Sequence, residues 1–83
     1  MSDRLNPNLI ASLTAIRNAL MELEIEGRTV TFAFNGNTVQ VEIFDGNGHG
    51  IRETFSFEEL DNLKENTAEY CLRRRLRFLA NTL

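Results

Sequence analysis

The sequence predicts an α+β domain of order α-β-β-β-α, in which the helices pack on one face of a three-stranded antiparallel meander. Apolar residues recur with the period of a helix near the start of the chain and again near its end. In the middle of the chain, apolar and polar residues alternate with the period of two that is typical of strands. An Asn-Gly pair and a Gly-rich segment separate the alternating runs, as turns do. Residues 1–83 are expected to form a single domain, because the chain is too short for two.

The first helix is predicted to begin at Pro7, because Asn6 is a good N-cap and proline suits the first helical position. The residues at helical spacing are Leu9, Leu13, Ile16, Leu20 and Leu23, and Ile10, Ala19 and Met21 widen this face. Gly27 is a natural stop, although the alternating run from Glu22 to Glu26 allows an end a few residues earlier.

Two strands are predicted on either side of Asn35-Gly36, the pair preferred in type I′ hairpin turns because both central positions need positive φ. The alternating apolar residues are Val30, Phe32 and Phe34 before the turn and Val39, Val41 and Ile43 after it. This turn sets Phe34 opposite Asn37, Phe32 opposite Val39 and Val30 opposite Val41 on one face. On the other face it sets Thr31 opposite Gln40 and Thr29 opposite Glu42.

A third strand is predicted near Gly50–Phe55. One register sets Glu42 opposite Glu53, which is unfavourable because like charges repel across strands. The other sets Glu42 opposite Arg52, Ile43 opposite Ile51 and Val39 opposite Phe55, and we expect this one. It makes the middle strand central and leaves Glu53 on the apolar face, which an edge strand tolerates.

The last helical region is predicted to begin with a capping box, Ser56-Phe57-Glu58-Glu59, with Phe55 and Leu60 at the two positions of a hydrophobic staple. A second cap-like unit begins at Asn66, which predicts a split there into a short helix from Phe57 to about Glu65 and a longer one from Thr67 to about Asn81. The residues expected to face the core are Phe57, Leu60, Leu63, Ala68, Cys71, Leu72, Leu76 and Leu79.

The composition excludes several classes of protein. A single cysteine cannot form an internal disulfide or a Cys-rich zinc site. No apolar run reaches the roughly 18 residues that a membrane span requires, and the first residues lack the apolar stretch of a signal peptide. We therefore expect a cytoplasmic protein that makes no membrane contact.

No catalytic, metal or cofactor site is predicted. The loop Asp45–Gly50 is spaced like the start of a calcium loop, but its twelfth position is Ser56 instead of glutamate. The loop leads into a strand, whereas phosphate loops lead into a helix. His49 and Cys71 supply the residue types of a base and a nucleophile, but Cys71 lies on the predicted apolar face and is expected to pack in the core. The chain is therefore not expected to be an enzyme.

The net charge of −3 is unevenly distributed. Residues 1–71 carry five basic and all twelve acidic residues, a balance of −7, whereas residues 72–83 carry four arginines and no acid, a balance of +4. Arg73, Arg74 and Arg77 share one flank of the predicted helix, because they are three or four residues apart. They form either a solvated helix end that pairs with acids of the body, or a patch that binds phosphate backbone or an acidic protein.

The α-β-β-β-α order resembles that of double-stranded RNA-binding domains. That family has a Lys-rich motif at the start of its last helix, where this chain has the acidic Ser56-Phe57-Glu58-Glu59-Leu60-Asp61, so RNA binding in that mode is not expected. In size, acidity and element order the chain is also similar to small phage-encoded inhibitors such as certain anti-CRISPR proteins, which implies an inhibitor of phage or mobile-element origin. No residue motif carries this second similarity, so it implies no site residues.

The expected function is that of a small, non-enzymatic interaction module, an adaptor or inhibitor, that binds another protein. The residues expected to contact the partner are Arg73, Arg74 and Arg77 on the last helix, and Thr29, Thr31, Gln40 and Glu42 on the polar face of the sheet. Nucleic-acid binding through the arginines is the alternative. The long apolar face of the first helix also allows a homodimer, because a thin core gains from association.

Overall fold

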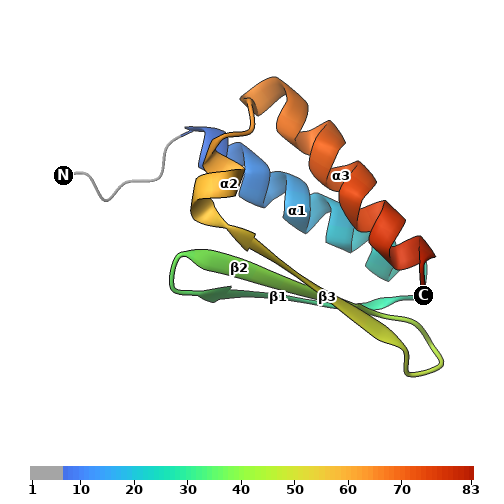
Figure 1. Ribbon diagram of the computed structural model, residues 1–83. Helices are drawn as coiled ribbons and strands as arrows, with labels where there is room; N and C mark the ends of the chain where they lie inside the picture. The colour runs from blue at the N-terminus through green and yellow to red at the C-terminus, as the bar shows by residue number, and fades with distance from the viewer. Residues whose placement is uncertain (1–6) are drawn as a thin grey trace.

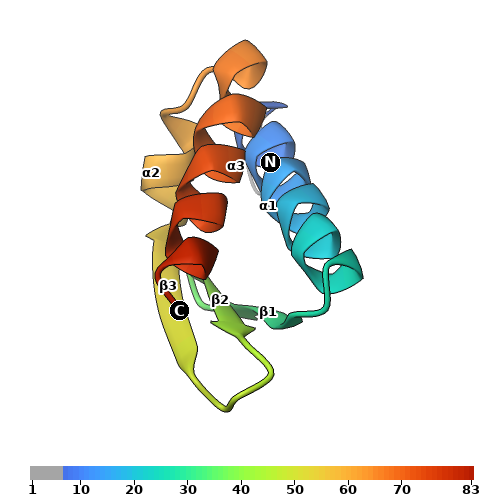
Figure 2. The ribbon, with the colours of Figure 1, turned by 90° about the vertical axis from the view of Figure 1, so that its right-hand side faces the viewer.

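The computed structural model describes residues 7–83, except for the side chains at positions 65 and 66, and it has the predicted α+β architecture. The helices are α1 (Pro7–Ile25), α2 (Phe57–Asp61) and α3 (Glu65–Asn81), and the strands are β1 (Thr29–Asn35), β2 (Thr38–Phe44) and β3 (Gly50–Ser56). α1 and α3 lie on the same face of the sheet (Figure 1) and run side by side above it (Figure 2). The predicted N-cap Asn6 lies outside the described residues.

The sheet is an antiparallel meander in the order β1-β2-β3, so β2 is the central strand as predicted. The predicted register of β2 and β3 is confirmed, with Glu42 opposite Arg52, Ile43 opposite Ile51 and Val39 opposite Phe55. Glu53 therefore lies on the side of β3 that faces the helices, between Ile51 and Phe55.

The first hairpin differs from the prediction, because its turn is centred one residue later, on Gly36 and Asn37. The turn is closed by Asn35 and Thr38, and the Thr38 hydroxyl donates to the Asn35 carbonyl at 2.7 Å. Of the two central residues, Gly36 has a positive φ of 64° and Asn37 does not. A positive φ at the first position alone fits a type II′ turn, whereas type I′ requires it at both.

The predicted pairing of β1 and β2 is therefore wrong by two residues. Phe34 lies opposite Val39, Phe32 opposite Val41, Val30 opposite Ile43, Thr31 opposite Glu42 and Thr29 opposite Phe44. The observed register pairs apolar residues along the whole helix-facing side and moves the polar Asn37 into the turn, which explains why it is preferred. A shift of two residues leaves every side chain on its predicted face.

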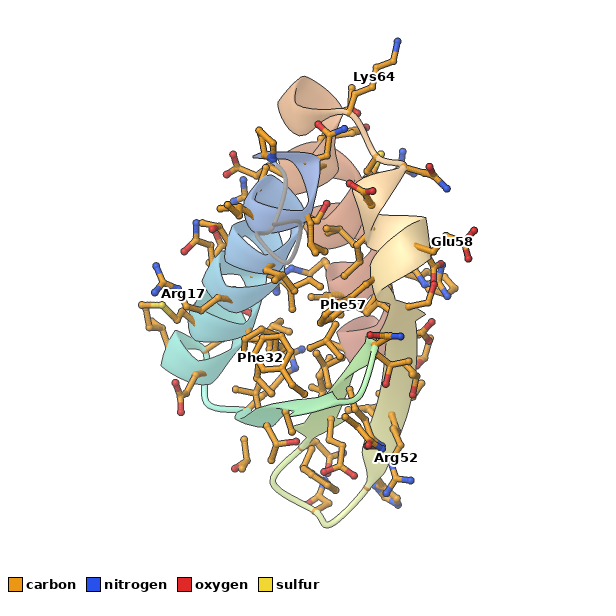
Figure 3. All side chains as sticks on the ribbon, turned by 90° about the vertical axis from the view of Figure 1, so that its left-hand side faces the viewer. Arg17, Phe32, Arg52, Phe57, Glu58 and Lys64 are labelled. Carbon is orange, nitrogen blue, oxygen red and sulfur yellow. The ribbon has the colours of Figure 1, made fainter. Side chains whose placement is uncertain are left out.

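The core lies between the sheet and the long helices. Its most deeply buried apolar side chains, each at most 1% exposed, are Ile16, Leu23, Val39, Val41, Ile43, Leu60, Ala68 and Leu76. Phe32 and Phe57 lie between the helices and the sheet, whereas Arg17 and Lys64 point away from the core (Figure 3). The large apolar side chains of α1 that remain exposed are Ile10, Met21 and Ile25, at 49%, 50% and 84%.

Among the residues that the structure describes, one polar side chain, that of Ser12, is buried in this core. The Ser12 hydroxyl, fully buried on α1, donates to the Leu60 carbonyl of α2 at 2.9 Å. A buried hydroxyl needs such a partner, because leaving it without a hydrogen bond would carry the full desolvation cost. The bond links the first helix to the second helical region, 48 residues later.

The capping box at the start of α2 is confirmed. Ser56 Oγ accepts from the Glu59 N–H at 3.0 Å, and the Glu59 carboxylate accepts from the Ser56 N–H at 3.2 Å. Phe55 and Leu60, the predicted staple residues, are both buried.

The split of the helical region comes earlier than predicted, at residues 62–64 instead of near Asn66. Lys64 is the N-cap of α3 and makes no side-chain capping bond. Its carbonyl accepts from the N–H groups of Thr67 and Ala68, both at 2.9 Å, so the helix is already formed where the second cap-like unit stands. A break between Leu60 and Ala68, which are both fully buried, lets both helices face the core.

Candidate interaction surface

α3 has two faces of different character. Toward the core it buries Ala68, Leu72, Leu76 and Ala80, which are four residues apart. The residues on the opposite side of the helix include Tyr70, Cys71, Arg74 and Phe78, and we call these four the outer face of α3. Tyr70 is 63% exposed and Phe78 is 67% exposed, so both rings present most of their surface to solvent. These four residues and Arg75 line one shallow surface hollow.

Cys71 is exposed, so the prediction that it packs in the core is wrong. It immediately precedes the buried Leu72, and one residue of a helix turns the side chain by about 100°, out of the core. His49 does not approach it: the His49 ring Nδ1 lies 3.3 Å from the Asp45 carboxylate. The hollows that Cys71 lines are formed by residues of β3, α2 and α3 and by Leu63 between the two helices, without His49.

Two of the three predicted site arginines pair with acids at the C-terminal end of α1. Arg77 donates to both carboxylate oxygens of Glu26, at 2.5 and 2.8 Å, and lies 3.7 Å from Glu22. Arg73 donates to Glu22, with nitrogen–oxygen distances of 3.0 and 3.2 Å. The hydrogen bond from Arg77 lowers the pKa of Glu26 and raises that of Arg77. These pairs attach α3 to the C-terminal end of α1.

Arg75, the remaining arginine of residues 72–83, lies against the sheet. It forms an ion pair with Glu53 at 2.5 Å, and its guanidinium lies 5.8 Å from the centroid of the Phe55 ring. Arg75 thus supplies a partner to the carboxylate on the helix-facing side of β3, which explains how that side accommodates Glu53.

Arg74 is arranged differently from its neighbours. Its guanidinium lies 5.6 Å from the centroid of the Tyr70 ring, and Nη1 donates to the Tyr70 hydroxyl at 3.2 Å. No ion pair among the described side chains involves Arg74. The sequence prediction missed Tyr70 and Phe78, although their spacing of four residues on either side of Arg74 was a signal for a common helix face.

The predicted sheet residues are on the face that carries no helix. There Thr31 lies opposite Glu42, and Gln40 lies two residues from Glu42 on β2. Thr29 lies two residues from Thr31 at the start of β1, opposite Phe44. The Glu42 carboxylate accepts from Thr31 Oγ1 at 3.0 Å and from Arg52 at 2.9 and 3.0 Å. Its hydrogen bonds to Arg52 and Thr31 lower the pKa of Glu42. The charged groups of Glu42 and Arg52 on this face are therefore paired with each other within the sheet.

The Gly-rich loop is ordered by its own carboxylate. Asp45 accepts from the backbone N–H groups of Asn47 and His49 at 2.8 and 3.0 Å, and these bonds lower its pKa. Over the residues that the structure describes, no group of three or more His, Cys, Asp or Glu side chains is placed to hold a metal ion.

Comparisons with protein families, with curated proteins and with solved structures found no match to the chain. Within the described range, none of the helices has the length and apolar character needed to cross a membrane.

Proposed function

We propose that the chain is a non-enzymatic adaptor or inhibitor that binds another protein through the outer face of α3. The observation that carries the proposal is the pair of exposed aromatic rings, Tyr70 and Phe78, on either side of an arginine without an acidic partner among the described residues. Tyrosine, phenylalanine and arginine are enriched at the centres of protein interfaces, where few residues supply most of the binding energy.

The chemistry of this face indicates the chemistry of its partner. Arg74 would lose water on binding, so the partner must supply an acceptor, and a carboxylate is the strongest one available. Tyr70 and Phe78 require apolar groups on either side of that carboxylate. The partner surface is therefore an acid flanked by apolar side chains. A second copy of α3 does not fit, because antiparallel packing of Tyr70 on Phe78 brings the two Arg74 guanidinium groups together.

Ion pairing also bears on the nucleic-acid alternative. Binding to a phosphate backbone gains affinity from each cation that neutralises a phosphate, so it needs several available guanidinium groups. Arg73, Arg75 and Arg77 are each paired with a carboxylate of the body. A nucleic acid would have to displace these acids, which favours a protein partner.

The test is selection of peptides from a displayed random-sequence library against the folded chain. We expect enrichment of sequences with an acidic residue between apolar residues. Selected peptides should bind the unmodified chain in calorimetry and lose at least tenfold in affinity for Arg74→Glu and for Phe78→Ser, since removing a central contact costs about 1.4 kcal/mol or more. Arg17→Glu is the matched control, because it makes the same charge change on the exposed side of α1.

Equal binding to Arg74→Glu and to the unmodified chain would refute this surface. Duplex or single-stranded nucleic acid should not bind at low salt. Binding that falls steeply with salt, is lost in Arg74→Glu and survives in Arg17→Glu would instead establish the nucleic-acid alternative.

A further inference from the structure

β1 is an edge strand without the features that keep edges from pairing. In the order β1-β2-β3, one side of β1 has no strand beside it. Its seven residues, Thr29–Asn35, include neither a charged residue nor a proline. The other edge, β3, carries Arg52 and Glu53. Because charges and prolines are the usual protection of an edge against strand addition, β3 is protected and β1 is not.

The free backbone groups of β1 belong to three residues. In a two-residue hairpin the closing pair, here Asn35 and Thr38, is hydrogen-bonded, and bonded and unbonded pairs then alternate along the strands. The unbonded positions of β1 are therefore Val30, Phe32 and Phe34. Their N–H and C=O groups point away from β2, toward the free edge.

The side chains of Val30, Phe32 and Phe34 form an apolar surface along that edge. The rings of Phe32 and Phe34 have centroids 5.5 Å apart, and Phe34 also meets Phe57 edge to face at 6.0 Å. Phe34 nevertheless remains 57% exposed. The aromatic cluster on the helix-facing side thus ends at the edge with one of its rings largely uncovered.

We propose that β1 pairs with β1 of a second copy of the chain, so that the two sheets become one. An antiparallel pairing about a two-fold axis at Phe32 sets Phe32 opposite Phe32 and Val30 opposite Phe34 of the other copy. Thr31 then lies opposite Ala33, and Thr29 opposite Asn35. Apolar residues meet on the helix-facing side, small and polar residues meet on the other, and no charged residue meets another.

This self-complementarity identifies the second copy as the occupant. Each of Val30, Phe32 and Phe34 donates one backbone hydrogen bond across the axis and accepts one, so all the free groups of the edge are satisfied. The pairing covers the exposed side of Phe34 with Val30 of the other copy. It leaves the outer face of α3 unused, so it is independent of the proposed function.

The first test is amide hydrogen exchange of the unmodified chain over a dilution series, beside sedimentation equilibrium. We expect a dimer at high concentration. The amides of Val30, Phe32 and Phe34 should exchange slowly in the dimer and at least tenfold faster on dilution, whereas those of Thr31 and Ala33, bonded to β2, should stay protected throughout. A chain that remains monomeric up to millimolar concentration would overturn the proposal, and so would a dimer without this alternation.

The second test uses two variants of one position. Phe34→Pro removes the outward N–H and Phe34→Ala retains it, and proline is tolerated on an edge strand where the N–H faces outward. We expect a monomer for Phe34→Pro and a weakened dimer for Phe34→Ala, both with unchanged circular dichroism. A dimer in Phe34→Pro would place the interface elsewhere. Equal loss in both variants would assign it to the aromatic ring instead of the strand edge. If Phe34→Pro does not fold, the exchange experiment decides.

Discussion

Arg77 holds Glu26 by two hydrogen bonds, at 2.5 and 2.8 Å, although the two residues are 51 positions apart in the sequence. Glu26 follows the last residue of α1, and Arg77 lies in the last two turns of α3. The pair therefore fixes the ends of the two long helices relative to each other, and it joins the acidic body to the basic C-terminal segment.

This ion pair predicts a pH-dependent contribution to stability. Because the bond lowers the pKa of Glu26, the contribution is complete above the ordinary glutamate pKa of about 4.3 and is lost as the pH falls through the lowered value. Glu26→Gln should therefore be less stable than the unmodified chain at neutral pH, and the difference should shrink in acid. Urea denaturation at several pH values measures it.

Arg77→Ala supplies the control for that experiment. The double variant should lose less than the sum of the losses caused by Glu26→Gln and Arg77→Ala, because both remove the pair between Arg77 and Glu26. Each residue also has a second contact, since Glu26 accepts from Arg28 at 2.8 Å and Arg77 lies 3.7 Å from Glu22. Additive losses, or a difference for Glu26→Gln that persists unchanged in acid, would contradict the assignment of the pair.

Gly50 should not tolerate a side chain. A Cβ at this position would overlap the ring of Phe44, the residue opposite it on β2. Gly50→Ala should lower the free energy of unfolding by about 1 kcal/mol, because the ring must move out of its place. Gly46→Ala is the matched control, since nothing lies within 4 Å of its added Cβ. Thermal denaturation that finds the two variants equally stable would show that Phe44 moves freely.

Ser12 should contribute to stability through its buried hydroxyl. Ser12→Ala removes the hydrogen bond to the Leu60 carbonyl and should cost about 1 kcal/mol, despite the better helix propensity of alanine. Thr14→Ala, at an exposed position of the same helix, reports the propensity change without the bond. An equal effect of both substitutions on chemical denaturation would mean that the Ser12 bond adds nothing.

Cys71 should react with a thiol reagent in the native state. Its exposure on α3 predicts labelling at a rate close to that of the unfolded chain, whereas a core cysteine reacts only after unfolding. Reaction of the native chain with a chromogenic disulfide reagent, with and without urea, measures the ratio. Labelling that requires urea would contradict the exposure of Cys71 and indicate that its thiol is buried. A bound α3 partner should slow the native reaction.

The faces of the strands and the β2–β3 register were predictable, because alternation and one charge pair, Glu42 with Arg52, decide them locally. The β1–β2 register was not. The Asn35-Gly36 pair indicated a two-residue turn, which is the length observed. The local sequence is compatible with a turn centred either on Asn35 and Gly36 or on Gly36 and Asn37. The pairing of Val30 with Ile43, which only the assembled hairpin shows, decides between them.

The arginines show the corresponding limit at the candidate surface. Helical spacing placed Arg73, Arg74 and Arg77 on one flank, but their partners depend on how α1 packs against α3. The position of Glu22 and Glu26 beside α3 follows from tertiary contacts between segments half a chain apart, which no local pattern contains. The stacking of Arg74 on Tyr70, in contrast, is a contact between residues four apart on one helix. Helical spacing alone could have predicted it.

The placement of α3 has a consequence for valence. α3 contacts β3 through Arg75 and Glu53, at the opposite edge of the sheet from β1 (Figure 2). Two chains joined at β1 would therefore carry two separate outer faces, both on the helix-bearing side. A partner with two matching sites, on one molecule or on one assembly, would be bound by both outer faces at once. Its avidity would be well above the affinity of either contact, and the distance between the two sites would determine by how much.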